Sequence, residues 1–307
     1  MKTIIIGVDQ GNRYIKSREG IYSCGFIVSR SEPLGMDEVI EFQGKYYCIG
    51  GSRKKYRQDK TIDDTYFILT LPAIAKRLEK EMLNEADIIL GIGLPLSHFN
   101  LKKKYIDYFT RGKVEFKYNN KKYLINIKEV MCFPQALSGY MLFYNKYKGI
   151  DFINLFDFGQ VTLDAVKIHN GKPLLDTAIS LNYGMLRLIK TIQENIRKEL
   201  GIEISEEQIE TNLQGRRGIF FKDEIEEIIK RTTVDFVNEM LGELRESQFE
   251  LQATMNLFMG GGSSIIQNTL DLNKHNGRIG YYEVMENAQL ANALGYEILV
   301  KEALKRR

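Results

Sequence analysis

The sequence predicts a two-domain α/β protein, and three observations support this prediction. The chain has 307 residues, which is enough for two domains of ordinary size. Short apolar segments typical of strands alternate with longer segments of helical periodicity. A strand, a polar turn containing Asp and Gly, and a second strand occur at residues 4–17 and again at residues 153–168. We therefore expect each half of the chain to begin with a tight β-hairpin that carries a carboxylate at its turn.

The first half is predicted to contain nine strands and three helices. Residues 3–8 are rich in β-branched side chains, residues 88–92 carry no polar side chain, and Asn119-Asn120 is a typical hairpin turn. Residues 65–84, 98–111 and 134–147 have helical spacing, and Pro134 suits the first turn of the last of these helices. The predicted strands are residues 3–8, 13–17, 21–29, 39–42, 45–49, 88–92, 114–118, 123–127 and 130–133.

The second half repeats the opening pattern and then becomes mostly helical. Strands are predicted at residues 152–156, 161–168 and 256–259. Helical spacing predicts helices at residues 183–200, 206–213, 222–244 and 284–305, with one more directly after the Gly260–Ser264 segment.

Composition excludes several classes of protein. The chain has 43 Lys and Arg against 40 Asp and Glu, and this formal charge of +3 is too small to predict direct nucleic-acid binding. Three Cys without a CxxC pair and three widely separated His argue against a disulfide framework or a zinc site, and favour a reducing cytoplasm. The N-terminal apolar run is three Ile, and no segment has the roughly 20 apolar residues of a membrane span. We therefore expect a cytoplasmic protein without a membrane anchor.

The two hairpin turns are candidate phosphate-binding loops. Backbone N–H groups of a Gly-containing turn can bind phosphate oxygens, and a nearby carboxylate can hold Mg²⁺, usually through water. Asp9 and Asp157 fit this role as a facing pair in two opposed domains, and Lys16 can contact phosphate as a point charge. Asp and Gly are also common in ordinary turns, so each loop alone has a purely structural alternative.

Two further segments are candidate site residues. Gly260, Gly261 and Gly262 follow an apolar strand, so a flat ligand or a phosphate can approach the backbone there. Gln135 is expected at the front of a helix, where its neutral amide can orient a water molecule without acting as a base. Asp164 either faces the same site or is a surface charge. No Walker A loop and no GxGxxG motif is present. The basic clusters Arg53-Lys54-Lys55, Lys102-Lys103-Lys104 and Arg306-Arg307 are expected on solvated faces.

Taken in order, five segments resemble the motifs of the actin superfamily of ATPases. They are GVDQGNRYIKS (residues 7–17) and FDFGQVTLDAV (156–166), which resemble the two phosphate motifs, LFMGGGSSII (257–266), which resembles the adenosine motif, and FPQALSGY (133–140) and ENAQLANALGYEIL (286–299), which resemble the two connecting helices. Within the superfamily, GIGLPLSHF (91–99), ANALGY (291–296) and the chain length are similar to bacterial plasmid-segregation actins of the ParM/StbA type.

The resemblance implies an actin-like ATPase fold of two ribonuclease-H-like α/β domains that face a nucleotide cleft. Domain I is expected at residues 1–150 with the last helix, about 289–307, returning to it, and domain II at residues 151–288. It also implies that ATP or GTP binds with Mg²⁺, that the chain forms homopolymeric filaments, and that a DNA-bound adaptor of the ParR type links them to a plasmid.

By the same resemblance, Asp9, Gly11, Asn12 and Lys16 match the first phosphate loop, and Asp157, Gly159 and Gln160 match the second. Gly260, Gly261 and Gly262 match the purine and ribose site, and Gln135 matches the residue that positions water. Asp9 and Asp157 would hold the Mg²⁺. The Gln160-Val161 pair departs from the Gly-Thr that is common in relatives, and the residues that bind the base are not placed. A small-metabolite kinase on the same ATPase fold is the alternative function.

Overall fold

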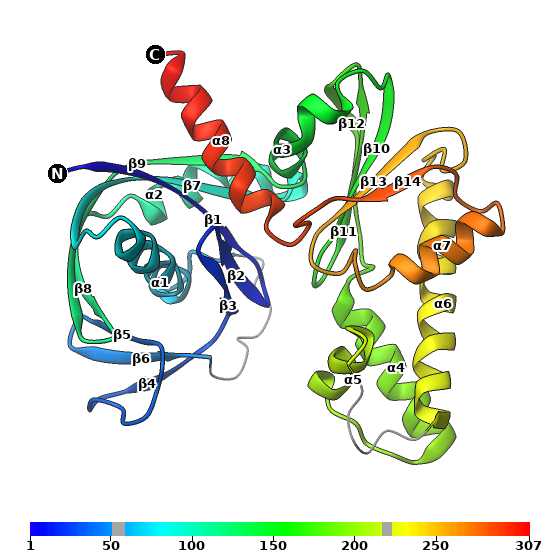
Figure 1. Cartoon of the computed structure of the whole chain (residues 1–307), viewed down its shortest axis with the longest axis horizontal. Helices are drawn as coiled ribbons and strands as arrows, with labels where there is room; N and C mark the ends of the chain where they lie inside the picture. The colour runs from blue at the N-terminus through cyan, green and yellow to red at the C-terminus, as the bar shows by residue number, and fades with distance from the viewer. Residues whose placement is uncertain (51–58, 217–222) are drawn as a thin grey trace. The chain divides into compact units, whose positions relative to one another are not determined.

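The structure is a computed structural model that describes residues 1–50, 59–216 and 223–307. The Arg53-Lys54-Lys55 cluster and the expected helix start at Lys222 lie outside these residues. The chain divides into two compact units, each a sheet with helices, which confirms the predicted α/β class (Figure 1). Unit 1 comprises Met1–Phe143 with Leu290–Arg307, and unit 2 comprises Tyr144–Gln289.

The sheet of unit 1 has the strand order β3-β2-β1-β7-β9-β8-β5-β6-β4 among the described residues. Strands β1, β7 and β9 run parallel to one another, and the first hairpin, β1–β2, is antiparallel. These strands are β1 (Thr3–Gln10), β2 (Tyr14–Ser17), β3 (Gly20–Ser23), β4 (Phe26–Ser29), β5 (Val39–Phe42), β6 (Lys45–Ile49), β7 (Glu85–Leu94), β8 (Gly112–Tyr118) and β9 (Lys121–Pro134).

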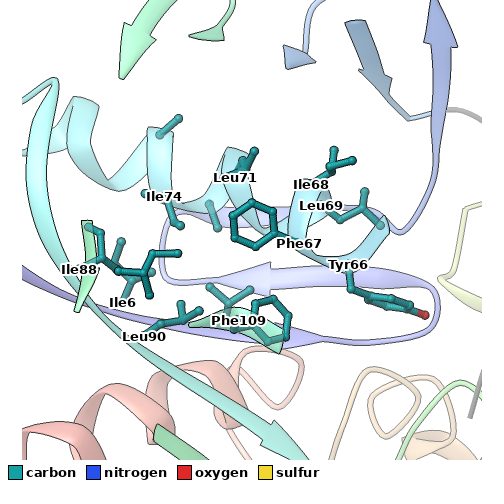
Figure 2. Packing of buried hydrophobic residues seen from close by; sticks show 14 of the residues in the cluster. Ile6, Tyr66, Phe67, Ile68, Leu69, Leu71, Ile74, Ile88, Leu90 and Phe109 are labelled. Atoms are coloured by element: carbon teal, nitrogen blue, oxygen red, sulfur yellow. The ribbon is translucent and has the colours of Figure 1, made fainter. Parts of the chain in front are cut away.

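The core of unit 1 lies between this sheet and helix α1 (Thr65–Lys80). Figure 2 shows Phe67 and Ile74 of α1 in one cluster with Ile6 of β1, and all three side chains are buried. Helix α2 (Lys102–Phe109), which follows a 3₁₀ helix (Leu96–Leu101), adds Phe109 to the cluster. Each fully buried side chain of this size stabilises the fold by about 1.5–3 kcal/mol, so this cluster fixes the strand that carries Asp9.

Helix α8 (Ala291–Lys305) packs on the other face of β1, although it lies at the opposite end of the sequence (Figure 1). Successive side chains of a strand point to opposite faces, so Gly7 faces α8 while Ile6 faces α1. A Cβ atom on Gly7 would lie 2.0 Å from the backbone oxygen of Ala293, so only glycine allows this approach. Buried Glu297 closes the contact, because Arg18 donates to its Oε2 from Nε at 2.8 Å and Nη2 lies 2.7 Å from the same atom.

Unit 2 is built on a sheet with the order β12-β11-β10-β13-β14 among the described residues. Its core is rich in phenylalanine, with Phe156, Phe158 and Phe258 fully buried. Buried Asn154 donates to Asn256 Oδ1 at 3.0 Å, which fixes the register of the parallel pair β10–β13. The elements are β10 (Phe152–Phe158), β11 (Leu163–His169), β12 (Lys172–Leu181), β13 (Met255–Met259), β14 (Tyr282–Val284), α4 (Met185–Leu200), α5 (Glu206–Leu213), α6 (Asp223–Glu246) and α7 (Gln267–His275). Helix α3 (Leu137–Tyr147) contains the boundary between the units.

Several element predictions are wrong in detail. β9 is one continuous strand, because its first part pairs with β8 while most of its length pairs with β7. β12 was not expected, since its side chains are mostly exposed or half-buried and show no clean alternation. α8 begins at Ala291 instead of residue 284, because residues 282–284 form β14 beside β13.

We predict that Gly7→Ala destabilises the protein by about 2–3 kcal/mol, because the added methyl group overpacks the contact between β1 and α8. Urea denaturation followed by circular dichroism measures the change. Gly149→Ala is the matched control, since a Cβ atom there meets nothing within 4 Å, and its midpoint should stay the same or rise slightly. Equal midpoints for Gly7→Ala and the wild type would contradict the prediction.

Candidate functional site

The first hairpin brings Asp9 and Lys16 together. The two residues are directly opposite in the β1–β2 pair, and Lys16 Nζ lies 3.4 Å from Asp9 Oδ2. The Asp9 residue is only 3% exposed, and the Lys16 side chain is 15% exposed. Salt screens a buried ion pair less than a surface pair, so the attraction between Asp9 and the Lys16 ammonium group is stronger here.

Gln135 joins this pair from a distant part of the chain. Its Nε2 donates to Asp9 Oδ1 at 2.9 Å. The expectation that Gln135 begins a helix is wrong, because it lies in the turn between β9 and α3, two residues before Leu137. The turn is sharp, with Ala136 in the left-handed region at φ 61°, and the Ala136 N–H donates to Asn292 Oδ1 at 3.0 Å. The structure thus places three of the expected site residues, Asp9, Lys16 and Gln135, in contact.

Asn12 and Gln10 are fixed by tyrosines of the neighbouring helices. Tyr66 donates from its hydroxyl to Asn12 Oδ1 at 3.3 Å. Gln10 is fully buried, where its Oε1 accepts from the Tyr105 hydroxyl at 3.3 Å and its Nε2 donates to Thr70 Oγ1 at 3.3 Å. Sequence reasoning missed Gln10, although a long polar side chain directly after Asp9 was an available signal. These bonds hold the turn that contains Gly11 and Asn12 on a rigid base.

The second hairpin has the same geometry with a different charge. Asp157 of β10 lies directly opposite Asp164 of β11, just as Asp9 lies opposite Lys16. Residues that are directly opposite in an antiparallel pair share one face, so Asp164 is on the same face as Asp157. Thr162 donates from Oγ1 to Asp164 Oδ2 at 3.2 Å, and the Gly159 N–H donates to the Thr162 carbonyl at 2.9 Å. The turn is closed by its own hydrogen bonds.

Helix α4 begins on this second loop. The N–H of Leu186 donates to the Gln160 carbonyl at 2.9 Å, and the N–H of Met185 donates to the Gly159 carbonyl at 3.2 Å. Gly184 is required at the junction, because a Cβ atom there would lie 2.4 Å from the backbone of Val161. The loop that contains Gln160 and Val161 is therefore compact, because its carbonyl groups bind the first N–H groups of α4.

The glycine segment packs against Asp157. Gly260 has φ +89°, and a Cβ atom on it would lie 2.4 Å from Asp157 Oδ1. A Cβ atom on Gly262 would lie 2.7 Å from the Phe158 ring, whereas one on Gly261 would come no closer than 3.5 Å to Gln289. The expected helix directly after this segment is wrong, because residues 261–266 form turns and α7 begins at Gln267. A ligand at this segment meets backbone, not a helix N-terminus.

Each unit thus presents a distinct chemical surface. In unit 1, the Lys16 ammonium and the Asp9 carboxylate of the first hairpin meet the Gln135 amide, and this set suits a phosphate group and a water molecule. In unit 2, two carboxylates share one face beside glycine backbone, which suits a hydrated cation. Within the described ranges, no three His, Cys, Asp or Glu side chains are arranged to hold a metal directly. In those same ranges, no helix is both long and apolar enough to cross a membrane.

Two family models match the chain in sequence order. Residues 7–137 match the N-terminal domain of actin-like proteins, and residues 155–272 match the C-terminal part of the archaeal MreB-like actin homologue. The chain belongs to the actin superfamily. These matches contain the turns of both hairpins and the glycine segment of this actin-like chain. The superfamily resemblance inferred from the sequence is therefore confirmed.

Solved structures of actin homologues share the fold of this actin-like chain. The archaeal actin homologue Ta0583 in complex with ADP is 19% identical with a TM-score of 0.75, and the alignment covers 97% of this chain and 99% of that one. A non-polymerisable mutant of pCBH ParM is 20% identical with a TM-score of 0.75, over 98% and 100%. The Alp12 filament structure is 17% identical with a TM-score of 0.68, over 99% and 100%. A sequence search of curated proteins found no match.

We predict that Gly260→Ala destabilises unit 2 by about 3 kcal/mol, through a left-handed backbone and a clash with Asp157. Thermal denaturation measures the loss as a lower Tm. The neighbouring Gly261→Ala is the matched control, because its Cβ atom has ordinary contacts and its φ is not left-handed. If Gly260→Ala and Gly261→Ala have equal Tm values, the close packing of Asp157 against Gly260 does not contribute to stability.

Proposed function

We propose that this actin-like chain binds and hydrolyses ATP or GTP with Mg²⁺ and uses the reaction to control a filament of its own copies. The observation that carries the proposal is the contact of Asp9 with both Lys16 and Gln135. An ammonium, a carboxylate and an amide meet there, and all three residues lie within a matched family model. The ADP complex of the structurally similar Ta0583 supports nucleotide as the ligand class.

Gln135 is proposed to position the attacking water. Its Nε2 is engaged by Asp9, so the amide oxygen is the atom that can accept a hydrogen bond from water. A neutral amide does not remove the proton, and phosphoryl transfer depends more on positioning than on deprotonation. Lys16 stabilises phosphate charge in this arrangement, and the turn of Gly11 and Asn12 offers backbone N–H groups to the phosphate oxygens.

Asp157 and Asp9 are proposed to hold the Mg²⁺ through water. Asp157 and Asp164 are directly opposite on neighbouring strands and share one face. Carboxylate oxygens are the ligands that a hydrated Mg²⁺ takes, so the residues present fit the ion. When bound, Mg²⁺ neutralises phosphate charge. Gly159 and Gln160 form the second phosphate loop in this proposal, and Gly260, Gly261 and Gly262 contact the purine and ribose.

The proposed setting is plasmid DNA segregation in the cytoplasm. ParM is among the structurally similar proteins, and Alp12 was solved as a filament, which supports self-association as the added function. The two compact units would be actin-like domains I and II, with boundaries near residues 150 and 289. All three cysteines are free thiols, which agrees with a reducing compartment. We further propose a DNA-bound ParR-type adaptor as the partner, because a net charge of +3 gives little affinity for direct DNA binding.

The wild-type protein should scatter light above a critical concentration when ATP or GTP and Mg²⁺ are added, and electron micrographs should show filaments. Omission of Mg²⁺ should abolish the signal, because the paired carboxylates and the phosphates then repel each other. Release of inorganic phosphate should accompany polymerisation. Phosphate transfer to a small acceptor without any polymer would instead identify a metabolite kinase.

We predict that Gln135→Ala lowers the rate of phosphate release about 10- to 100-fold while nucleotide affinity changes little, because only the positioning of water is lost. Single-turnover phosphate release and nucleotide titration measure the two quantities. Gln267→Ala on the exposed start of α7 is the control. An unchanged rate in Gln135→Ala, or in Asp157→Ala, would contradict these site assignments.

A further inference from the structure

Lys60 contacts the first hairpin from a segment that the family motifs do not contain. Its Nζ donates to the backbone carbonyl of Gln10, the residue directly after Asp9. The same ammonium lies 5.3 Å from the centre of the Tyr66 ring, which adds a cation–π contact. Tyr66 itself donates to Asn12, so the segment from Lys60 to Tyr66 contacts the turn on both sides of Gly11.

The segment that carries Lys60 is held by bonds of the neighbouring residues. The neighbouring Asp59 carboxylate accepts from the Thr61 N–H at 2.9 Å, and Lys104 of α2 donates to it at 2.5 Å. The contact with Lys104 and the bonds from Thr61 lower the pKa of Asp59 to about 2, so this carboxylate stays charged and keeps its partners. Lys60 is therefore oriented by residues on both sides and by the start of α1.

Lys60, Lys16 and Asp9 set the charge at the first hairpin among the described residues. Burial lowers the pKa of Lys60, the nearby Asp9 opposes that effect, and Lys16 adds to it. Asp9 already accepts from Gln135 and pairs with Lys16. Two ammonium groups thus act on one carboxylate, and a buried charge is costly unless it is paired. An anion beside the hairpin would offset the desolvation of both lysines.

We propose that Lys60 is a further phosphate-site residue, whose ammonium adds a second positive charge beside Lys16 and fixes the backbone of the first loop at Gln10. This inference rests on the proposed nucleotide function. The ligand class is the polyphosphate of a nucleotide, and the nucleoside part has no share in the contact. Lys60 also links phosphate occupancy to the start of α1, because the same segment holds Gln10 and Asn12.

The test compares a nucleoside diphosphate with its nucleoside. Isothermal titration of the full chain with ADP or GDP, whichever the wild type binds, should give a Kd about 10-fold weaker in Lys60→Met. The Kd for adenosine or guanosine should change less than 2-fold, because neither carries phosphate. Lys103→Met, which removes an exposed lysine of α2 in the same unit, should match the wild type for both ligands.

Two more variants separate charge from structure. Lys60→Gln keeps an N–H donor for the Gln10 carbonyl and loses the charge, so it should fold even if Lys60→Met does not, and it should also weaken ADP binding. Lys60→Arg keeps the charge and should restore most of the affinity. Equal ADP affinity in wild type and Lys60→Gln, or equal losses for ADP and adenosine, would overturn the inference and leave the proposed function intact. If the wild-type protein binds no nucleotide, both the inference about Lys60 and the proposed function are wrong.

Discussion

The close packing of α8 on β1 is the contact on which unit 1 depends. It joins the two ends of the chain, because Gly7 lets the backbone of Ala293 approach and Glu297 is buried against Arg18. The Glu297 side chain is only 3% exposed, so loss of Arg18 would leave a buried carboxylate without this partner. The same contact positions the site: β1 ends at Asp9 and Gln10, and Asn292 of α8 holds the turn that carries Gln135.

The two hairpins show how one backbone geometry serves two kinds of chemistry. In both hairpins, the residue opposite the aspartate decides the local charge: Lys16 is opposite Asp9, whereas Asp164 is opposite Asp157. The first hairpin is suited to an anion and the second to a cation.

Local signals in the sequence predicted much of the fold. The helix at Glu206–Leu213 was expected with its observed bounds, and its capping box shows why: Ser205 accepts from the Gln208 N–H at 3.2 Å, and Gln208 accepts from the Ser205 N–H at 3.0 Å. The strands that were missed, β12 and β14, lie at the two edges of the unit 2 sheet. Edge strands are half-solvated, so their side chains follow no strict alternation and their pairing comes from the neighbouring strand.

The sequence alone determined the order of the motifs, the two acidic hairpins and the superfamily, because turns, strands and caps depend on residues close together in the chain. Only the tertiary structure decided which side chains meet. Gln135 reaches Asp9 across 126 residues, and Lys60 reaches Gln10 across 50. Asp157 packs against Gly260 because the ends of the paired strands β10 and β13 lie side by side. Such contacts arise from how strands and helices pack, and no local pattern encodes them.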